Sequence, residues 1–302
     1  MNPAPKAAPA NEAGGAESAK KAITRKVRYV MRQKAVQEVA ALLSEAKIPG
    51  LLIKGFGLAA TSYDKPWQRD MADVDILLPR DLWNSAIAIL RNQYGKANVP
   101  SLKGRSYSQR WLGEQGVLVS FGSTSVLIEL HNSVDKVSPR PIPFYELYSR
   151  AVCLPELPGT LRPPDTEDQV LLTIAHLGNS QFQHEPGWRD LELLIHQGLH
   201  WDVIVERARR YKLDTCLYVG VQTLQRRGIH MDGLWLEKLQ PSPLRKRMIA
   251  RFLRDQPAKH EPRERPTGLR WIAEQSLLRD DIGWLFGVGR YALLRIIDRL
   301  EL

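Results

Sequence analysis

Residues 71–79 read MADVDILLP, in which Asp73 and Asp75 stand on either side of a valine and before an Ile-Leu-Leu run. Branched and apolar residues of this kind favour a half-buried β-strand. Side chains two positions apart in a strand point to the same face, so the two carboxylates are expected to lie side by side. Because like charges this close repel each other, the pair indicates either a solvated edge or a bound cation.

The bulk composition is typical of a soluble globular protein. The chain has 302 residues, of which 43% are hydrophobic, and this suits one large domain or two ordinary ones. No uninterrupted apolar stretch approaches the ~20 residues that cross a bilayer. Residues 1–22 are rich in Ala, Pro, Gly and Ser, lack the apolar core of a signal peptide and are predicted to be a disordered tail. Cys153 and Cys216 form no ligand or redox motif, which indicates a reducing, cytoplasmic setting.

The net charge of +10 is concentrated at the two ends of the chain. Residues 1–34 carry +6 and residues 241–302 carry +5, which leaves −1 for residues 35–240. A basic flank can bind nucleic acid or another anionic surface, although most such flanks are simply solvated. The segment that contains the two aspartates is not itself basic.

The order of predicted elements changes once along the chain. The first part alternates helices with short strands: a helix that Pro49-Gly50 ends, a strand over 51–54, a helix from residue 58, the aspartate strand, a helix over 79–96 and two strands within 116–132. From Pro163 onward the pattern is helical only. We therefore predict an α/β domain with a mixed sheet over residues 23–160, followed by an all-helical C-terminal domain over residues 161–302.

Two further groups of residues carry chemistry. The stretch LLIKGFGLAATSY (51–63) reads as a strand, a glycine turn at Gly55 and a helix start, which is a ready site for an anion such as phosphate. Lys54 and Arg69 add positive charge beside it. In SVLIELH (125–131), Glu129 stands in an apolar strand with His131 two positions on, facing the same side. Three acidic residues on neighbouring strands form an oxygen-rich site that suits Mg²⁺.

These motifs, in this order, resemble the bacterial uncharacterised nucleotidyltransferase family within the polymerase-β-like nucleotidyltransferase superfamily. The matching residues are Lys54-Gly55 at the end of the first strand, Arg69 four positions before the aspartate strand, D-V-D-I-L at 73–77 and E-L-H at 129–131. The resemblance continues in DQVLLTIAHLGN, where the family's histidine is His176, and in HWDVIVERARRYKL. It covers roughly residues 36–230.

The resemblance implies a polymerase-β-like core and a metal-dependent nucleotidyltransferase activity. It implies Mg²⁺, with Mn²⁺ as an alternative, held by Asp73, Asp75 and Glu129, which are also the implied catalytic residues. Lys54, Gly55 and Arg69 are implied to bind the NTP, and His131 and His176 are candidate accessory residues. The chain departs from the wider superfamily in having Phe56 where a serine usually follows the glycine, and WRD at 188–190 matches only loosely, which leaves the role of Asp190 open.

The sequence leaves the acceptor of the nucleotide open. A small hydroxyl compound or a peptide or protein side chain is favoured, because the catalytic core lacks the basic stripe with interleaved aromatics that a bound strand uses. A toxin-like enzyme acting on tRNA or another RNA is the first alternative, in which the basic ends of the chain bind the RNA. A non-catalytic binding protein that retains the fold is the second, and the intact acidic residues argue against it.

Overall fold

A computed structural model describes residues 12–99, 107, 111–135, 139–157, 159–231, 233–254, 268–281 and 283–300. Its strands are β1 (Gly50–Ile53), β2 (Val74–Leu77), β3 (Glu114–Phe121), β4 (Thr124–His131) and β5 (Leu161–Arg162). The helices of the N-terminal half are α1 (Glu12–Glu45), α2 (Lys54–Ser62), the 3₁₀ helix η1 (Pro66–Gln68), α3 (Trp83–Asn98) and α5 (Phe144–Arg150). Those of the C-terminal half are α6 (Thr166–Asn179), α7 (Glu185–Ile195), α8 (Trp201–Arg210), α9 (Asp214–Arg226), α10 (Trp235–Lys238), α11 (Pro243–Arg254), α12 (Gly268–Leu277) and α13 (Gly283–Arg299).

The five strands form one mixed sheet in the order β3-β4-β2-β1-β5. β2 runs parallel to β4 and β1 parallel to β5, whereas β1 and β2, and β3 and β4, are antiparallel. β2 and β4 are therefore direct neighbours in the middle of the sheet, although they lie far apart in the sequence. This pairing brings the aspartate strand beside the strand that carries Glu129.

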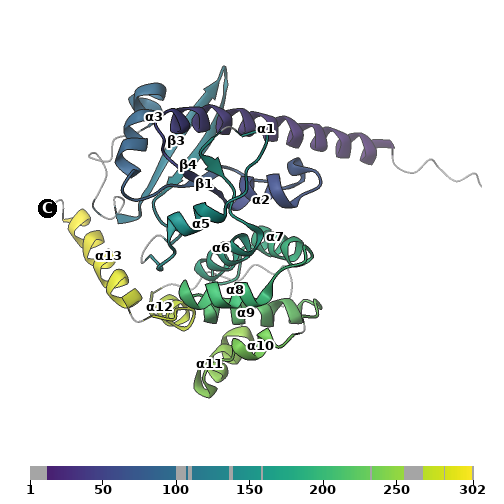
Figure 1. The fold of residues 1–302 in the computed structure, drawn as a ribbon, viewed down its shortest axis with the longest axis vertical. Coiled ribbons are helices and arrows are strands. Elements are labelled where there is room, and N and C mark those ends of the chain that lie inside the picture. Colours follow the sequence, from purple (N-terminus) through teal and green to yellow (C-terminus); the bar gives the residue numbers. More distant parts are fainter. Residues whose placement is uncertain are drawn as a thin grey trace, which may run out of the picture.

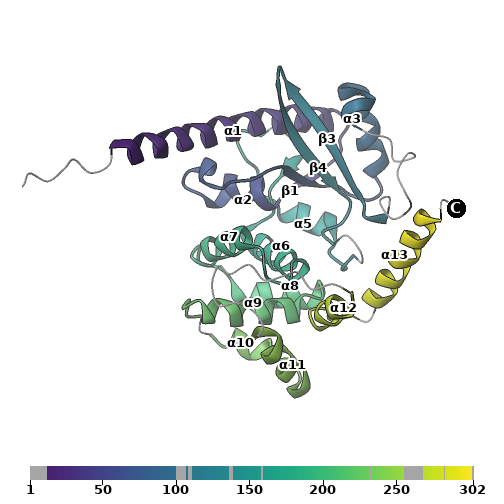
Figure 2. The ribbon, with the colours of Figure 1, turned by 180° about the vertical axis from the view of Figure 1, so that it is seen from behind.

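The sheet lies between two layers of helices (Figures 1 and 2). On one face, α1 and α3 pack on alternate residues of the strands, among them Leu52, Ile76 and Ile128. On the other face, Ile53 and Leu77 belong to one continuous core with α5 and the C-terminal helices. Because side chains in a strand alternate between faces, Asp75, between Val74 and Ile76, points to the same side as Leu77, towards the helical half.

The structure confirms the predicted fold, a mixed sheet with helices followed by a helical C-terminal half, and refines three boundaries. β2 begins at Val74, so Asp73 lies in the loop just before the strand rather than within it. α1 extends back to Glu12, so the described part of the predicted disordered tail is helical, as its alanine content favours. β5 completes the sheet just beyond residue 160, because Leu161 pairs with Gly50. Residues 1–11 lie outside the described residues, and none of the described helices is long and apolar enough to cross a membrane.

Candidate active site

The parallel pairing of β2 and β4 sets the geometry of the acidic residues. Asp75 lies directly opposite Glu129, and Leu77 lies opposite His131. Glu129 and His131 are two positions apart, so they share the face of the sheet on which Asp75 stands. One carboxylate or imidazole atom from each of the three residues lies within 4.8 Å of the others. Strand pairing thus brings Asp75 to two residues that are distant from it in the sequence.

Asp75 is the most buried of the acidic residues in this group, with 5% of its surface exposed. Its Oδ1 accepts hydrogen bonds from Lys54 Nζ at 2.6 Å and from His131 Nε2 at 2.8 Å. Burial alone would raise the pKa of Asp75, but these two partners outweigh it and lower the pKa to about 2. Both contacts use Oδ1, and the described residues place no hydrogen bond on Oδ2. Asp75 is therefore ionised, with one oxygen left for another ligand.

His131 stands among three carboxylates. Besides Asp75, its Nδ1 lies 3.4 Å from Glu114 Oε1 and its Nε2 lies 3.8 Å from Glu129 Oε2. Burial would lower the pKa of His131, yet the hydrogen bonds to Asp75 and Glu114 raise it. Because both ring nitrogens face carboxylates, the protonated imidazolium is the form that this site favours. The E-x-H pattern at 129–131 was the sequence signal for this arrangement.

Glu129 is half-buried and differs from Asp75 in its electrostatics. Burial raises its pKa, and the nearby negative charge of Asp73 raises it further, while His131 opposes the shift. Two neighbouring carboxylates whose pKa values are pushed in opposite directions are typical of acid–base sites. Glu129 is the member of the pair with the higher proton affinity.

The predicted metal ligands were Asp73, Asp75 and Glu129. Among the described residues, ligand atoms of Asp75, Glu129 and His131 lie close enough together to reach a single ion. Asp73 lines the same cavity from the loop before β2, and its negative charge raises the pKa of Glu129. Asp73 therefore lies near the cluster, whereas His131, expected as an accessory residue, is one of its members.

β1 leads directly into α2, whose first residue, Lys54, contacts Asp75. Gly55, predicted to form a turn, is the second residue of this helix. Lys54 has a φ of 55°, in the left-handed region that non-glycine residues rarely adopt. The junction is also tightly packed, because a Cβ on Gly57 would lie 2.2 Å from the carbonyl oxygen of Leu52. A Cβ on Gly55 would meet Met71 Cβ at 3.3 Å. The N-terminus of α2 and the ammonium of Lys54 are thus held at one wall of the cavity.

Arg69 is held by the helical half rather than pointing freely at the cavity. Its Nε and Nη2 donate to the two carboxylate oxygens of Asp190, in α7, at 2.7 and 2.8 Å. Its Nη1 donates to the carbonyl of Asp70, and Tyr63 donates to Asp190 Oδ1 at 2.6 Å. Such a bidentate pair is strong and geometrically specific. Sequence reasoning left Asp190 open, because a partner 121 residues away gives no local pattern.

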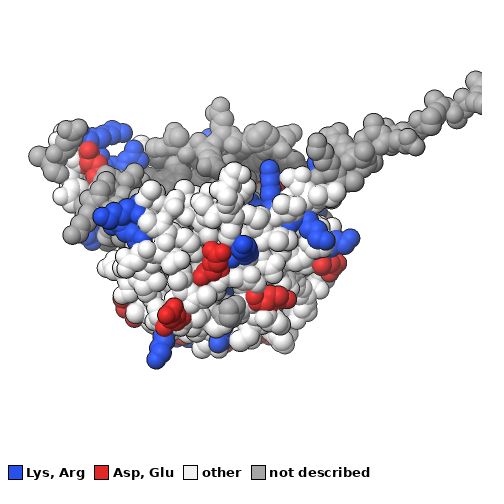
Figure 3. Space-filling view, turned by 90° about the horizontal axis from the view of Figure 1, so that it is seen from above, with Lys and Arg blue, Asp and Glu red and all other residues white. Residues whose placement is uncertain are grey.

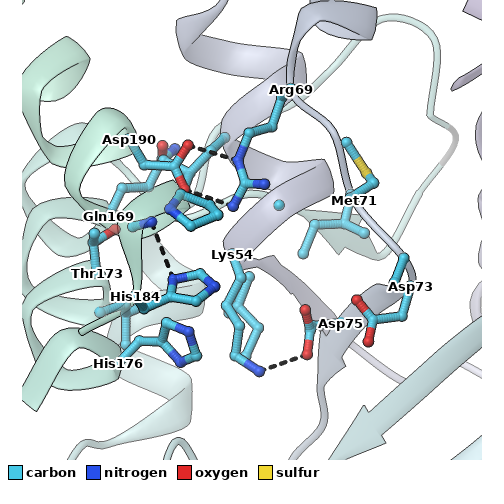
Figure 4. Close-up of a pocket in the computed structure, with 18 of the residues that line it drawn as sticks. Lys54, Arg69, Met71, Asp73, Asp75, Gln169, Thr173, His176, His184 and Asp190 are labelled. Carbon is cyan, nitrogen blue, oxygen red and sulfur yellow. Dashed lines mark hydrogen bonds and ion pairs between the residues drawn. The ribbon is translucent and has the colours of Figure 1, made fainter. Parts of the chain in front are cut away.

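One cavity of about 520 Å³ lies between the sheet and helices α6 and α7 (Figure 4). Most of the residues described above line it, but His131 does not. Asp73, Asp75 and Glu129 lie on the sheet side, and Lys54 reaches across the space between Asp75 and the helices. On the helix side stand His176 and His184, whose rings meet edge to face with centroids 4.6 Å apart. His184 Nδ1 accepts a hydrogen bond from the backbone N–H of Gly187 at 3.0 Å. Most of the residues predicted from the sequence therefore share one cavity. It also contains Asp190, whose role the sequence left open, and His184, which the sequence did not indicate.

A model of the uncharacterised nucleotidyltransferase family matches residues 16–227 of this chain. No curated protein matches the chain. Since the match covers more than two thirds of the residues and includes every site residue described above, the chain belongs to the uncharacterised nucleotidyltransferase family and is a nucleotidyltransferase. Helices α10–α13 lie beyond the matched segment.

Proposed function

We propose that this member of the nucleotidyltransferase family transfers a nucleoside monophosphate from an NTP to a hydroxyl or similar nucleophile, releasing pyrophosphate, with the help of Mg²⁺ or Mn²⁺. The observation that carries the proposal is the pairing of Asp75 with Glu129 on adjacent parallel strands. Their carboxylates face one cavity that also contains Asp73, Lys54 and the start of α2. A triphosphate needs this combination of metal ligands and phosphate donors in one place.

The donor atoms fit a divalent metal ion. Carboxylates such as those of Asp73, Asp75 and Glu129 are the ligands that Mg²⁺ and Mn²⁺ prefer. The ionised state of Asp75 favours a cation as well. A bound divalent ion would supply charge neutralisation for the phosphates and orient the attacking and leaving oxygens.

Glu129 is the proposed general base for the acceptor. Its pKa is raised, so it takes a proton more readily than Asp75, whose pKa is about 2. A base acts on a proton within hydrogen-bond reach, and Glu129 lines the cavity from β4. His131 is proposed to orient Asp75, because it donates to Oδ1 and fixes the carboxylate.

The junction of β1 and α2 is the proposed phosphate site. Lys54 brings an ammonium to the centre of the cavity, and the backbone N–H groups at the start of α2 favour negative charge. Arg69, which the resemblance implies to bind the NTP, lines the cavity and donates its hydrogen bonds to Asp190 and to the carbonyl of Asp70. We therefore propose that Arg69 adds positive potential at the cavity and fixes its wall.

His176 and His184 are proposed to contact the nucleotide or acceptor from the helix side. Because Nδ1 of His184 accepts from Gly187, the proton of its neutral ring is on Nε2, which makes that atom a donor. Both rings stand across the cavity from Asp75 (Figure 4). This places the helical half in the role of closing the site over the bound substrates.

A small molecule or a peptide or protein side chain is the favoured acceptor. On the face that Figure 3 shows, the described Lys and Arg side chains are interspersed with Asp and Glu and form no continuous basic stripe. Two cations of α1 also make contacts within the chain, since Lys26 lies over the Trp67 ring and Arg32 donates to the carbonyl of Met71. An RNA acceptor would need other cations of this helix, such as Arg25 and Arg28.

A gel-shift titration of total tRNA against salt separates the two acceptor classes. If RNA is the acceptor, binding is sub-micromolar, falls steeply with salt and is lost in R25E/R28E, because phosphate contacts release counterions. On the favoured proposal, the wild type binds tRNA weakly and R25E/R28E changes nothing. This pair of reversals spares Lys26 and Arg32, whose internal contacts would confound the result.

The activity itself is tested by incubating the protein with each labelled NTP, Mg²⁺ or Mn²⁺, and a cell extract. We expect label from the α-phosphate, but not from the γ-phosphate, in an acceptor of low mass or in a protein. An absence of transferred label with all four NTPs and both metals, in several extracts, would contradict the proposal.

A further inference from the structure

One face of helix α1 packs against the two segments that carry the proposed phosphate and metal sites. Lys26 lies over the Trp67 ring at 5.1 Å from its centroid. Tyr29 stacks on Phe56, directly after Gly55, with ring centroids 5.4 Å apart. These two residues of α1 are three positions apart, so they stand on one side of the helix. Arg32 follows three positions later and continues this row.

The third contact is the one nearest the acidic cluster. Arg32 Nη2 donates to the carbonyl oxygen of Met71 at 2.5 Å and lies 3.4 Å from that of Ala72. These are the two peptide groups that immediately precede Asp73. Partial burial lowers the pKa of Arg32, and the carboxylates of Asp70 and Asp73 oppose that shift, so the guanidinium stays charged beside them.

Asp73 needs such support because the sheet does not hold it. β2 begins only at Val74, and the ladder to β4 starts with the pair Val74–Ile128. Asp75 is fixed by Lys54 and His131, but Asp73 lies in the loop, half-exposed. A carboxylate must be held to within a fraction of an ångström to serve a metal or a substrate. The backbone on its N-terminal side is held by Arg32.

We propose that Arg32 is a positioning residue that fixes the loop before β2, and with it the carboxylate of Asp73, for metal and nucleotide binding. This inference rests on the proposed function in assigning Asp73 to the metal site. It gives α1 a role in building the active site, where its basic sequence had indicated a solvated flank or, as the alternative, contact with nucleic acid. A charged guanidinium that donates to backbone carbonyls is well suited to the task, since charge-assisted hydrogen bonds are the strong ones.

The test is a double-mutant cycle between Arg32 and Asp73. Mn²⁺ is titrated by electron paramagnetic resonance into wild type, R32Q, D73N and R32Q/D73N, each with an equimolar mixture of the four NTPs. We expect R32Q to weaken Mn²⁺ binding about tenfold in the wild-type background, and to add almost nothing in the D73N background. R32K restores part of the loss, because an ammonium can still reach one carbonyl. R28Q is the matched control, an exposed arginine one turn earlier on the same helix, and should bind Mn²⁺ as wild type does.

Hydrogen exchange gives a readout that does not depend on activity. In R32Q, the backbone amides of residues 70–74 should exchange faster than in R28Q, while those of β1 stay unchanged. Equal losses of Mn²⁺ affinity from R32Q in the wild-type and D73N backgrounds, or unchanged exchange of this loop in R32Q, would overturn the inference. If wild type binds no Mn²⁺ with any NTP, the proposed function fails instead, and the exchange result still decides whether Arg32 holds the loop.

Discussion

At the scale of single residues, the site depends on two carboxylates with opposite electrostatics. The sheet pairs Asp75 with Glu129, but Asp75 contacts Lys54 and His131, whereas Glu129 is half-buried beside Asp73. The pKa of Asp75 is accordingly about 2 and that of Glu129 is raised. On the proposed function, this difference suits Asp75 to binding a cation and Glu129 to accepting a proton.

Glu129→Gln keeps the shape of the side chain but removes its charge and basicity. We expect transfer to fall about 10²-fold or more, the usual scale for a positioned base, while NTP binding changes much less. Because the pKa of Glu129 is raised above its ordinary 4.5, the acid limb of the wild-type rate profile should lie above pH 4.5. Steady-state kinetics across pH test both points, and near-wild-type turnover in the variant would show that Glu129 is only a strand residue.

His131 should make stability depend on pH in the metal-free protein. Its folded pKa is raised above the ordinary 6.5, so its contribution is fully present below pH 6.5 and is lost as pH rises through the folded pKa. Asp75 acts in the opposite range, where stability is lost as pH falls from about 3.8 towards 2. Urea unfolding in EDTA measures the free energy of unfolding at each pH. In the wild type this free energy should be lower above pH 6.5 than below it, and H131Q should not show this decrease. Parallel curves for the two proteins would refute the assignment.

The residue-scale chemistry was only partly predictable. The D-x-D and E-x-H spacings placed Asp75, Glu129 and His131 on shared faces, because strand periodicity is a local property. These spacings did not reveal that Asp73 precedes β2, because the end of a strand depends on where its pairing with the neighbouring strands stops. The contact of Lys54 with Asp75 was not predictable either, because it joins residues 21 positions apart that meet only when β1 pairs with β2.

At the scale of elements, close backbone packing where β1 meets α2 builds the wall of the proposed phosphate site. Gly57 allows α2 to approach β1, and a Cβ there would stand 2.2 Å from the Leu52 carbonyl oxygen. Gly57→Ala should therefore destabilise the protein by about 2 kcal/mol or more, the scale of overpacking against backbone. Gly289→Ala is the matched control, because a Cβ at that position in α13 meets nothing within 4 Å.

The control should be neutral or stabilising by up to about 1 kcal/mol, since alanine is the better helix former. Denaturant unfolding of the two variants measures the difference. Equal stability of G57A and wild type would mean that the junction adapts without cost, and that the glycine is there for another reason.

Element boundaries show where sequence reasoning loses resolution. Helix and strand types followed from periodicity, yet β5, which has two residues, carries no pattern of its own and exists because it pairs with β1. Likewise, α1 looked like a basic flank, but Lys26, Tyr29 and Arg32 contact Trp67, Phe56 and Met71. Contacts between distant segments determine both features.

At the scale of the whole molecule, the Arg69–Asp190 ion pair joins the sheet half to the helical half. The side chains are 11% and 3% exposed, so the pair is largely buried. Removing one partner leaves an uncompensated charge, and Asp190→Ala should cost about 3–5 kcal/mol of unfolding free energy. Asp202→Ala breaks an exposed pair with Lys238, 75% and 52% exposed, and should change stability by less than about 1 kcal/mol. Denaturant unfolding measures both losses of stability. If Asp190→Ala and Asp202→Ala lose similar amounts of unfolding free energy, the Arg69–Asp190 pair does not hold the two halves together.

The cavity exists only in the assembled molecule, because the sheet supplies the carboxylates while α6 and α7, with the turn between them, supply His176, His184 and Asp190. The family match covers both halves up to residue 227, which agrees with a site that needs them together. On the proposed function, Asp73 and Asp75 bind a metal-bound NTP in this cavity.

The most direct measurement is a thermal shift of wild type and of D73N/D75N with each NTP, with and without Mg²⁺ or Mn²⁺. We predict that at least one NTP stabilises the wild type only when the metal is present. The double variant should be less stable than the wild type, because the substitution of Asp75 removes the ion pairs with Lys54 and His131, but it should fold and show no metal-dependent shift. Equal, metal-dependent stabilisation of both proteins would contradict the account.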